Sequence, residues 1–209
     1  MEPVHSAAEL ARLSSLVHNI IGWLLLALAA MQLREALTAL AERPARIPWP
    51  AVGALIGVGL AVWVFFHQIF THGVGPFDDP VQNQHQAIGW VVGLGALGEL
   101  LRRKGWLRGW LASGAWGTAL VLVGVLFLVH EQHAIEALLV HWALAATLIL
   151  SGLCEISVGL TGGSTRALRV LGVLILGAAA AQLVVYEEEP GAHGDHDAAP
   201  APASPAHDH

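Results

Sequence analysis

Long runs of apolar residues constrain this chain more than any other feature. Of its 209 residues, 55% are hydrophobic and 12% are charged, whereas soluble domains carry about 25% charged residues. Several runs approach the roughly 20 residues that a helix needs to cross a hydrocarbon core about 30 Å thick. They are rich in Leu, Ala, Val and Gly and lack the alternation of membrane β-strands. The sequence therefore predicts an all-α, polytopic membrane helix bundle.

Six transmembrane helices are expected within residues 1–186. Prolines break the chain between the first and second apolar runs, and Gly-rich or charged segments separate the others. The expected helices are Ser14 to Leu37, Val52 to Phe70, His85 to Leu101, Gly109 to Val129, Ile135 to Leu160, and Ala167 to Tyr186.

The positions of Lys and Arg predict the orientation of the bundle. Nine of the ten basic residues fall in the first, third and fifth connections: Arg34, Arg43, Arg46, Arg102, Arg103, Lys104, Arg108, Arg166 and Arg169. Cytoplasmic loops carry an excess of Lys and Arg, so both termini are expected outside. We expect an integral protein of a bacterial inner membrane, with the second and fourth connections on the outer, periplasmic side.

The final segment, residues 187–209, is predicted to be a separate region. It is acidic, rich in Pro and Ala and without apolar periodicity, so it is predicted to be disordered. Its histidines lie beside aspartates, which suits either a solvated tail or loose collection of divalent metal. The formal charge of −6 argues against nucleic acid as a partner. The expected partners are the lipid bilayer and a divalent metal, and protein partners are not indicated.

All twelve histidines fall in the outer half of the predicted topology. The densest stretch is VHEQHAIEALLVHW, Val129 to Trp142, and its paired histidines are three residues apart, on one helical face if the helix continues. Topology was derived from Lys and Arg alone, so this clustering is independent of it. Six histidines at similar depth, contributed by five helices, are the predicted metal ligands: His18, His67, His85, His130, His133 and His141.

Zinc or copper is the cofactor that this set of side chains favours. Imidazole is a common ligand of both metals, and ionisable groups in membrane segments are functional by default. Two methionines and the single cysteine, Cys154, argue against a soft Cu(I) thioether path. The alternative is that these histidines bind no metal or cofactor and only form hydrogen bonds at the membrane interface.

Three functions fit such a site, and whether the chain is an enzyme stays open. The favoured one is binding or handling of the metal. In the first alternative, a b-type haem lies between two histidines and carries electrons. In the second, a membrane zinc-dependent hydrolase uses Glu131 or Glu136 as a base beside a metal-bound water with a pKa of about 7.

Two acidic residues are expected at the opposite, inner end of the bundle. Glu99 and Glu155 fall near the inner ends of the third and fifth helices. They are expected to meet Arg102, Arg103 or Arg169, since intramembrane acids are often paired structurally; a proton or ion path is the alternative.

Two stretches resemble the transmembrane protein 45 family, a group of multi-helix membrane proteins. They are LFLVHEQHAIEALLVHWALAATLILSGLCEI, Leu126 to Ile156, and HQAIGWVVGLGALGELL, which begins at His85. The chain departs from the family in the spacing of HEQH and in having six expected helices where the family is drawn with seven. The family has no settled activity, so the resemblance supports the site and not a function. By this resemblance, the residues of this chain that match positions of the family are His85, His130, His133, His141 and Glu155.

Overall fold

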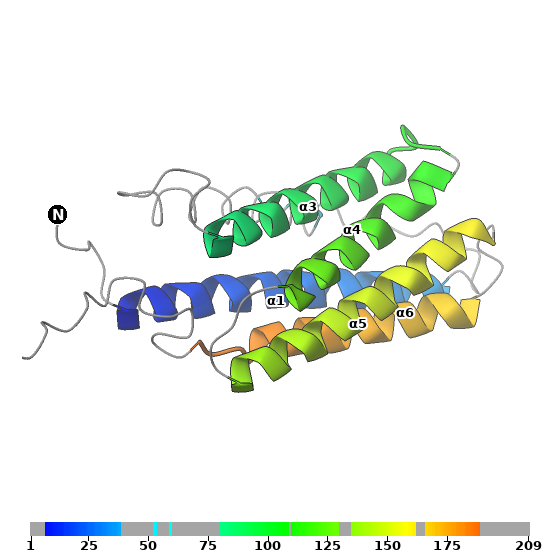
Figure 1. Cartoon of the computed structure of the whole chain (residues 1–209). Helices are drawn as coiled ribbons and strands as arrows, with labels where there is room; N and C mark the ends of the chain where they lie inside the picture. Colours follow the sequence, from blue (N-terminus) through cyan, green and yellow to red (C-terminus); the bar gives the residue numbers. More distant parts are fainter. Residues whose placement is uncertain are drawn as a thin grey trace, which may run out of the picture.

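The computed structural model shows a bundle of long helices whose neighbours run antiparallel (Figure 1). It describes residues 7–38, 52–53, 59, 80–108, 110–129, 135–161 and 166–188. In these ranges every regular element is helical and no strand occurs, which confirms the all-α prediction. The long helices are α1 (Ala7–Thr38), α3 (Pro80–Arg103), α4 (Trp110–Leu128), α5 (Ile135–Leu160) and α6 (Arg166–Val184).

Two helices begin earlier than their apolar runs. Helix α1 starts at Ala7 rather than near Ser14, a difference that arises because charged residues in its first two turns interrupt the apolar signal. Ser15 Oγ donates to the Ala11 carbonyl oxygen at 2.9 Å, a bond by which serine is accommodated inside a helix. Helix α3 starts at Pro80 rather than His85, since proline suits a first turn that leaves its N–H groups unbonded.

The second expected helix, Val52 to Phe70, lies outside the described residues except at three helical positions. These are Val52, Gly53 and Gly59. Val52 is fully buried in the core. A Cβ atom on Gly59 would lie 2.9 Å from the Gly89 carbonyl oxygen of α3, so the two backbones approach closely here.

The described helices follow one another in space as an arc. Helix α3 packs on α4, α4 on α5, α5 on α6, and α6 on α1. Glycines bring the backbones of α4 and α5 together, because a Cβ atom on Gly152 would lie 2.5 Å from the Gly117 carbonyl oxygen. Ser151 on α5 donates to the Gly172 carbonyl oxygen of α6 at 2.9 Å. Close backbone approach through small residues is typical of helices that pack in lipid.

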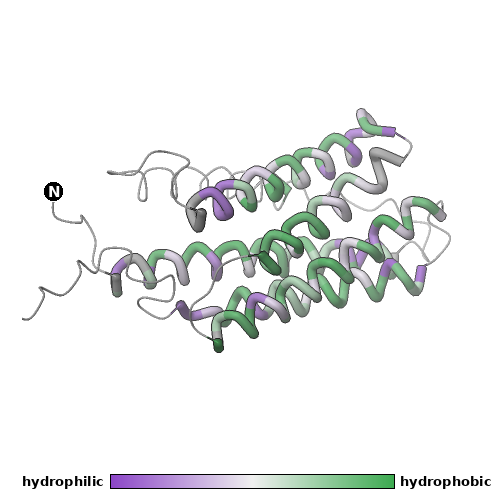
Figure 2. The backbone as a smooth tube through the Cα atoms, viewed as in Figure 1, coloured by the Kyte–Doolittle hydropathy of each residue, from purple (hydrophilic) through white to green (hydrophobic). Residues whose placement is uncertain are grey.

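Hydrophobic side chains cover the outside of the bundle as well as its core. Leucines on four helices, Leu94, Leu122, Leu150 and Leu174, are between 47% and 61% exposed. Figure 2 shows hydrophobic residues along the lengths of the helices and hydrophilic residues gathered towards their ends. Such a surface is compatible with lipid and not with water.

Three described helices are long and apolar enough to cross a membrane. They are Ala11–Leu37, Ala137–Leu160 and Arg166–Val184, and a shorter apolar segment, Gly114–Leu128, lies in α4. These segments belong to the first, fifth, sixth and fourth of the expected helices. The apolar helices indicate an integral membrane protein in contact with the lipid bilayer.

Candidate functional site

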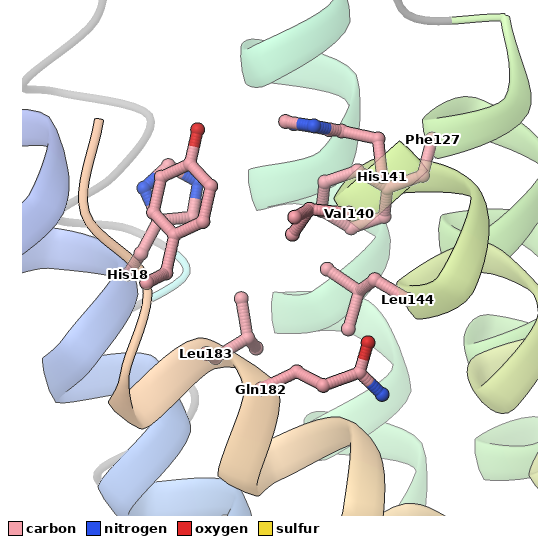
Figure 3. Close-up of a pocket in the computed structure, with 8 residues that line it drawn as sticks. His18, Phe127, Val140, His141, Leu144, Gln182 and Leu183 are labelled. Atoms are coloured by element: carbon pink, nitrogen blue, oxygen red, sulfur yellow. The ribbon is translucent and has the colours of Figure 1, made fainter. Parts of the chain in front are cut away.

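Three predicted metal ligands lie at one end of the bundle, where they line two pockets that share His18. The first pocket lies between His18 of α1 and His141 of α5, which Figure 3 shows on opposite sides of it. The second pocket is lined by His18 and by His85 of α3. His18 thus shares one pocket with His141 and the other with His85, so the three histidines from three helices lie at the same end of the bundle. The other three predicted ligands, His67, His130 and His133, lie outside the described residues.

Tyr186, which follows the last turn of α6, connects two of these histidines. Its ring centroid is 4.8 Å from that of His18 and 5.9 Å from that of His141. Phe127 at the end of α4 packs on the other side, with its ring centroid 5.4 Å from that of His141. Tyr186 is 9% exposed and His141 is 4% exposed. Aromatic rings at these separations pack edge-on or tilted and hold one another in fixed orientations.

Both imidazole rings are anchored to their own helix through Nδ1. His18 Nδ1 lies 2.8 Å from the Ser14 carbonyl oxygen, and His141 Nδ1 lies 2.7 Å from that of Ala137. A carbonyl oxygen only accepts hydrogen bonds, so Nδ1 carries the proton in each neutral ring. The lone pair of each neutral ring is therefore on Nε2. Metal-binding histidines commonly have this arrangement, in which a second acceptor fixes the tautomer and the ring orientation.

The segment after α6 is tied to the start of α1. The Glu188 backbone N–H donates to Ser15 Oγ at 2.8 Å, and the Ser14 hydroxyl donates to the Glu188 carboxylate. Glu188 is therefore held against the turn of α1 that carries His18, although its position in the sequence falls in the predicted tail. These contacts place a negative charge close to the histidine end of the bundle.

Tyr186 and Glu188 are the residues of this site that sequence reasoning missed. Tyr186 is the only tyrosine in the chain, and this is the one signal that distinguishes it. Glu188 lies in an acidic run, Glu187 to Glu189, in which composition alone gives no reason to single out one residue. Their roles come from the position of the last helix beside the first.

The pKa of Tyr186 is raised well above its ordinary value, first by burial and then by the nearby Glu188 carboxylate. We expect its phenolate absorption band to appear only at a pH above the usual tyrosine value of about 10. After unfolding, the same band should appear near that usual value. An absorbance titration of the folded and unfolded protein checks this, and the single tyrosine makes its assignment direct.

The sign of the effect on stability follows from this difference. Because the unfolded state loses its phenolic proton first, the contribution of Tyr186 to stability is complete below a pH of about 10. That contribution is lost as the pH rises through the pKa of the folded state. Glu188→Gln should bring the folded pKa partly back, since burial is the larger cause. An ordinary titration of Tyr186 in the folded protein would contradict the packing of Tyr186 against the two histidines.

No group of three or more His, Cys, Asp or Glu side chains arranged to hold a metal ion occurs within the ranges that the structure describes. Two described histidines meet at Tyr186, and the third lines the adjoining pocket. A complete metal site therefore requires ligands from the remaining predicted positions.

A buried ion pair lies at the opposite end of α3. Arg102 donates to both carboxylate oxygens of Glu99, through Nε at 2.7 Å and Nη2 at 2.6 Å. Glu99 is 3% exposed. The pKa of the Arg102 guanidinium is raised, foremost by this hydrogen bond, and Glu155 and Glu35 raise it further. Arg102 is one of the three basic residues expected to pair with Glu99. Glu155 on α5 and Glu35 on α1 add two further carboxylates near the same arginine.

Comparison of the chain with protein-family models gave no match, and comparison with curated proteins and with solved structures gave no significant similarity. The resemblance to the transmembrane protein 45 family therefore stays a prediction.

Proposed function

We propose that this protein binds or handles zinc or copper at a histidine site on the outer face of a membrane. In this proposal the chain crosses the bilayer six times, both termini lie outside, and the membrane is a bacterial inner membrane. The metal would be held at the end of the bundle that carries His18, His85 and His141.

The observation that carries the proposal is the arrangement of His18 and His141. They come from helices far apart in the sequence, contact the same tyrosine, and have the same Nδ1 anchor on a backbone carbonyl. Two neutral imidazoles with the same tautomer offer Nε2 as the metal-binding atom. A metal could bind either ring at Nε2 without a change of tautomer.

Two of the remaining predicted ligands, His130 and His133, have described neighbours in the chain that support their inclusion. The Gln84 amide, next to His85, donates to the Val129 carbonyl oxygen at 2.8 Å, so the start of α3 meets the end of α4. His130 follows Val129 directly, and His133 lies just before Ile135, where α5 begins. This contact supports a role for both histidines in the same site as His85.

Elemental analysis of the purified protein, combined with its absorption spectrum, tests the proposal. We expect about one zinc or copper ion per chain and no Soret band, because three or four imidazole ligands satisfy either metal. Iron with a Soret band would instead make the protein a haem-binding electron carrier, the alternative that the histidines also permit. A protein that stays metal-free after incubation with either metal would overturn the proposal.

Substitution of a ligand should abolish this binding. His141→Ala and His18→Ala are each expected to weaken metal binding by at least about 100-fold, since even changes to groups that only orient a ligand cause losses of 10–100-fold. Isothermal titration with zinc and copper measures the change. His5→Ala is the matched control, because His5 is not a predicted ligand. Truncation after Glu188 removes the four tail histidines, so metal bound by the tail is counted separately.

A further inference from the structure

The turn between α3 and α4 has a geometry set by one glycine. Helix α3 ends at Arg103, and Gly105 follows in the left-handed region with a φ of 73°. The Gly105 N–H donates to the Arg102 carbonyl oxygen at 2.9 Å. The Trp106 N–H donates to the Leu101 carbonyl oxygen, also at 2.9 Å. These two bonds form the Schellman arrangement that ends many helices, so the residues after Gly105 leave the helix in a defined direction.

The turn exposes a large aromatic side chain between two basic ones. Trp106 is 75% exposed, and Lys104 and Arg108, two residues away on either side, are exposed as well. An indole ring of this exposure would leave a large apolar surface in water. Tryptophan is enriched where a membrane meets water, because its ring suits the layer of lipid headgroups. Lys104 and Arg108 therefore lie at the depth of the headgroup phosphates.

The charges around this turn favour an anionic partner. Arg102 points inward and pairs with Glu99, which is buried. The other carboxylates near Arg102, on Glu35 and Glu155, are half-buried in the bundle. From Leu100 to His130 the sequence has no Asp or Glu. The predicted inner end carries nine basic residues and four acidic ones, a formal charge of +5 in a chain whose total is −6. Such a local field attracts anions to the surface of the protein.

We propose that the turn from Lys104 to Arg108 binds the headgroup of an anionic phospholipid. The two basic side chains meet the negative charge of the headgroup, and the Trp106 ring lies beside it in the interface. The apolar exterior of α3, where Leu94 is 61% and Leu97 is 39% exposed, takes the acyl chains. Basic clusters next to a membrane-spanning helix attract anionic lipids in this way. The proposal goes beyond metal binding and depends neither on it nor on which face of the membrane the turn occupies.

Native mass spectrometry of the full chain in detergent tests the proposal. The protein is titrated with dioleoyl phosphatidylglycerol in one arm and with dioleoyl phosphatidylcholine, which has no net charge, in the other. Lys104→Gln combined with Arg108→Gln should weaken binding of the first phosphatidylglycerol by about 25-fold, roughly fivefold for each charge. Binding of phosphatidylcholine should not change. The native protein should prefer phosphatidylglycerol by at least the same factor.

A matched variant separates this turn from the charge of the whole protein. Arg12→Gln removes one exposed basic side chain from α1 at the histidine end and should leave both affinities unchanged. Trp106→Ala should weaken binding of the two lipids by the same factor, because the ring acts on depth and not on charge. Equal affinity of the native protein for the two lipids would overturn the proposal. So would displacement of phosphatidylglycerol by an equal concentration of glycerol phosphate, which would assign the turn to a free anion.

Discussion

Gly152→Leu should destabilise the protein by about 3 kcal/mol or more, at the upper end of the range for overpacked interiors. A Cβ atom at this position would lie 2.5 Å from the Gly117 carbonyl oxygen and 2.8 Å from Val121 Cγ2. Because the nearest atom belongs to the backbone, no side-chain rotation relieves the contact, and α4 must move away from α5. The leucine improves helix propensity by about 1 kcal/mol, which does not offset the separation of the two helices. Unfolding in mixed detergent micelles measures the change.

Gly177→Leu in α6 is the matched control for this substitution. A Cβ atom on Gly177 meets no described atom within 4 Å. The same change of residue type should therefore leave the stability unchanged or raise it by up to about 1 kcal/mol through helix propensity. Equal stability of the two variants would contradict the close approach of α4 and α5 at Gly117 and Gly152.

Arg102→Ala should have the second large effect on stability, a loss of about 2–4 kcal/mol in the free energy of unfolding. Removing one partner of a buried ion pair costs about 3–5 kcal/mol, because it leaves the other charge uncompensated. The lower end of our range allows for the Arg102 side chain, which is 38% exposed, whereas that of Glu99 is 4% exposed. Unfolding in mixed micelles again provides the measurement.

A double substitution separates the buried charge from the loss of packing. Glu99→Gln combined with Arg102→Met removes both charges and keeps side chains of similar length. Much of the stability should then return, since replacing a whole buried pair is often neutral. If the double variant were as unstable as Arg102→Ala, the loss would come from packing and not from a stranded carboxylate.

The arginine partner of Glu99 was among those expected from the sequence, and the reason is local. Glu99 and Arg102 are three residues apart on one helix, and this spacing brings two side chains together whatever lies around them. Helical periodicity and apolar length are local in the same sense. They predicted the all-α fold, and the expected helix Ile135 to Leu160 has the bounds of α5. The starts of α1 and α3 were misplaced because polar first turns carry no apolar signal.

The histidine end of the bundle shows what local patterns do not contain. Depth along each helix was readable, so His18, His85 and His141 were expected at one level, and they line adjoining pockets. Which of them face each other was not readable, because it depends on the rotation and order of the helices. The contact of Tyr186 with His18 and His141 exists only because α6 packs between α1 and α5.

The sequence by itself thus predicted an apolar helical protein, with its histidines at one depth and nine of its ten basic residues at the other. The tertiary structure decided which side chains meet. It brought Glu188 to Ser14 of the first helix and left the buried Trp116 N–H without a hydrogen-bond partner in the part of the chain that the structure describes. The physical reason is that hydropathy and spacing act along one helix, whereas helix order is set by contacts such as Gly117 with Gly152, where two backbones fit together.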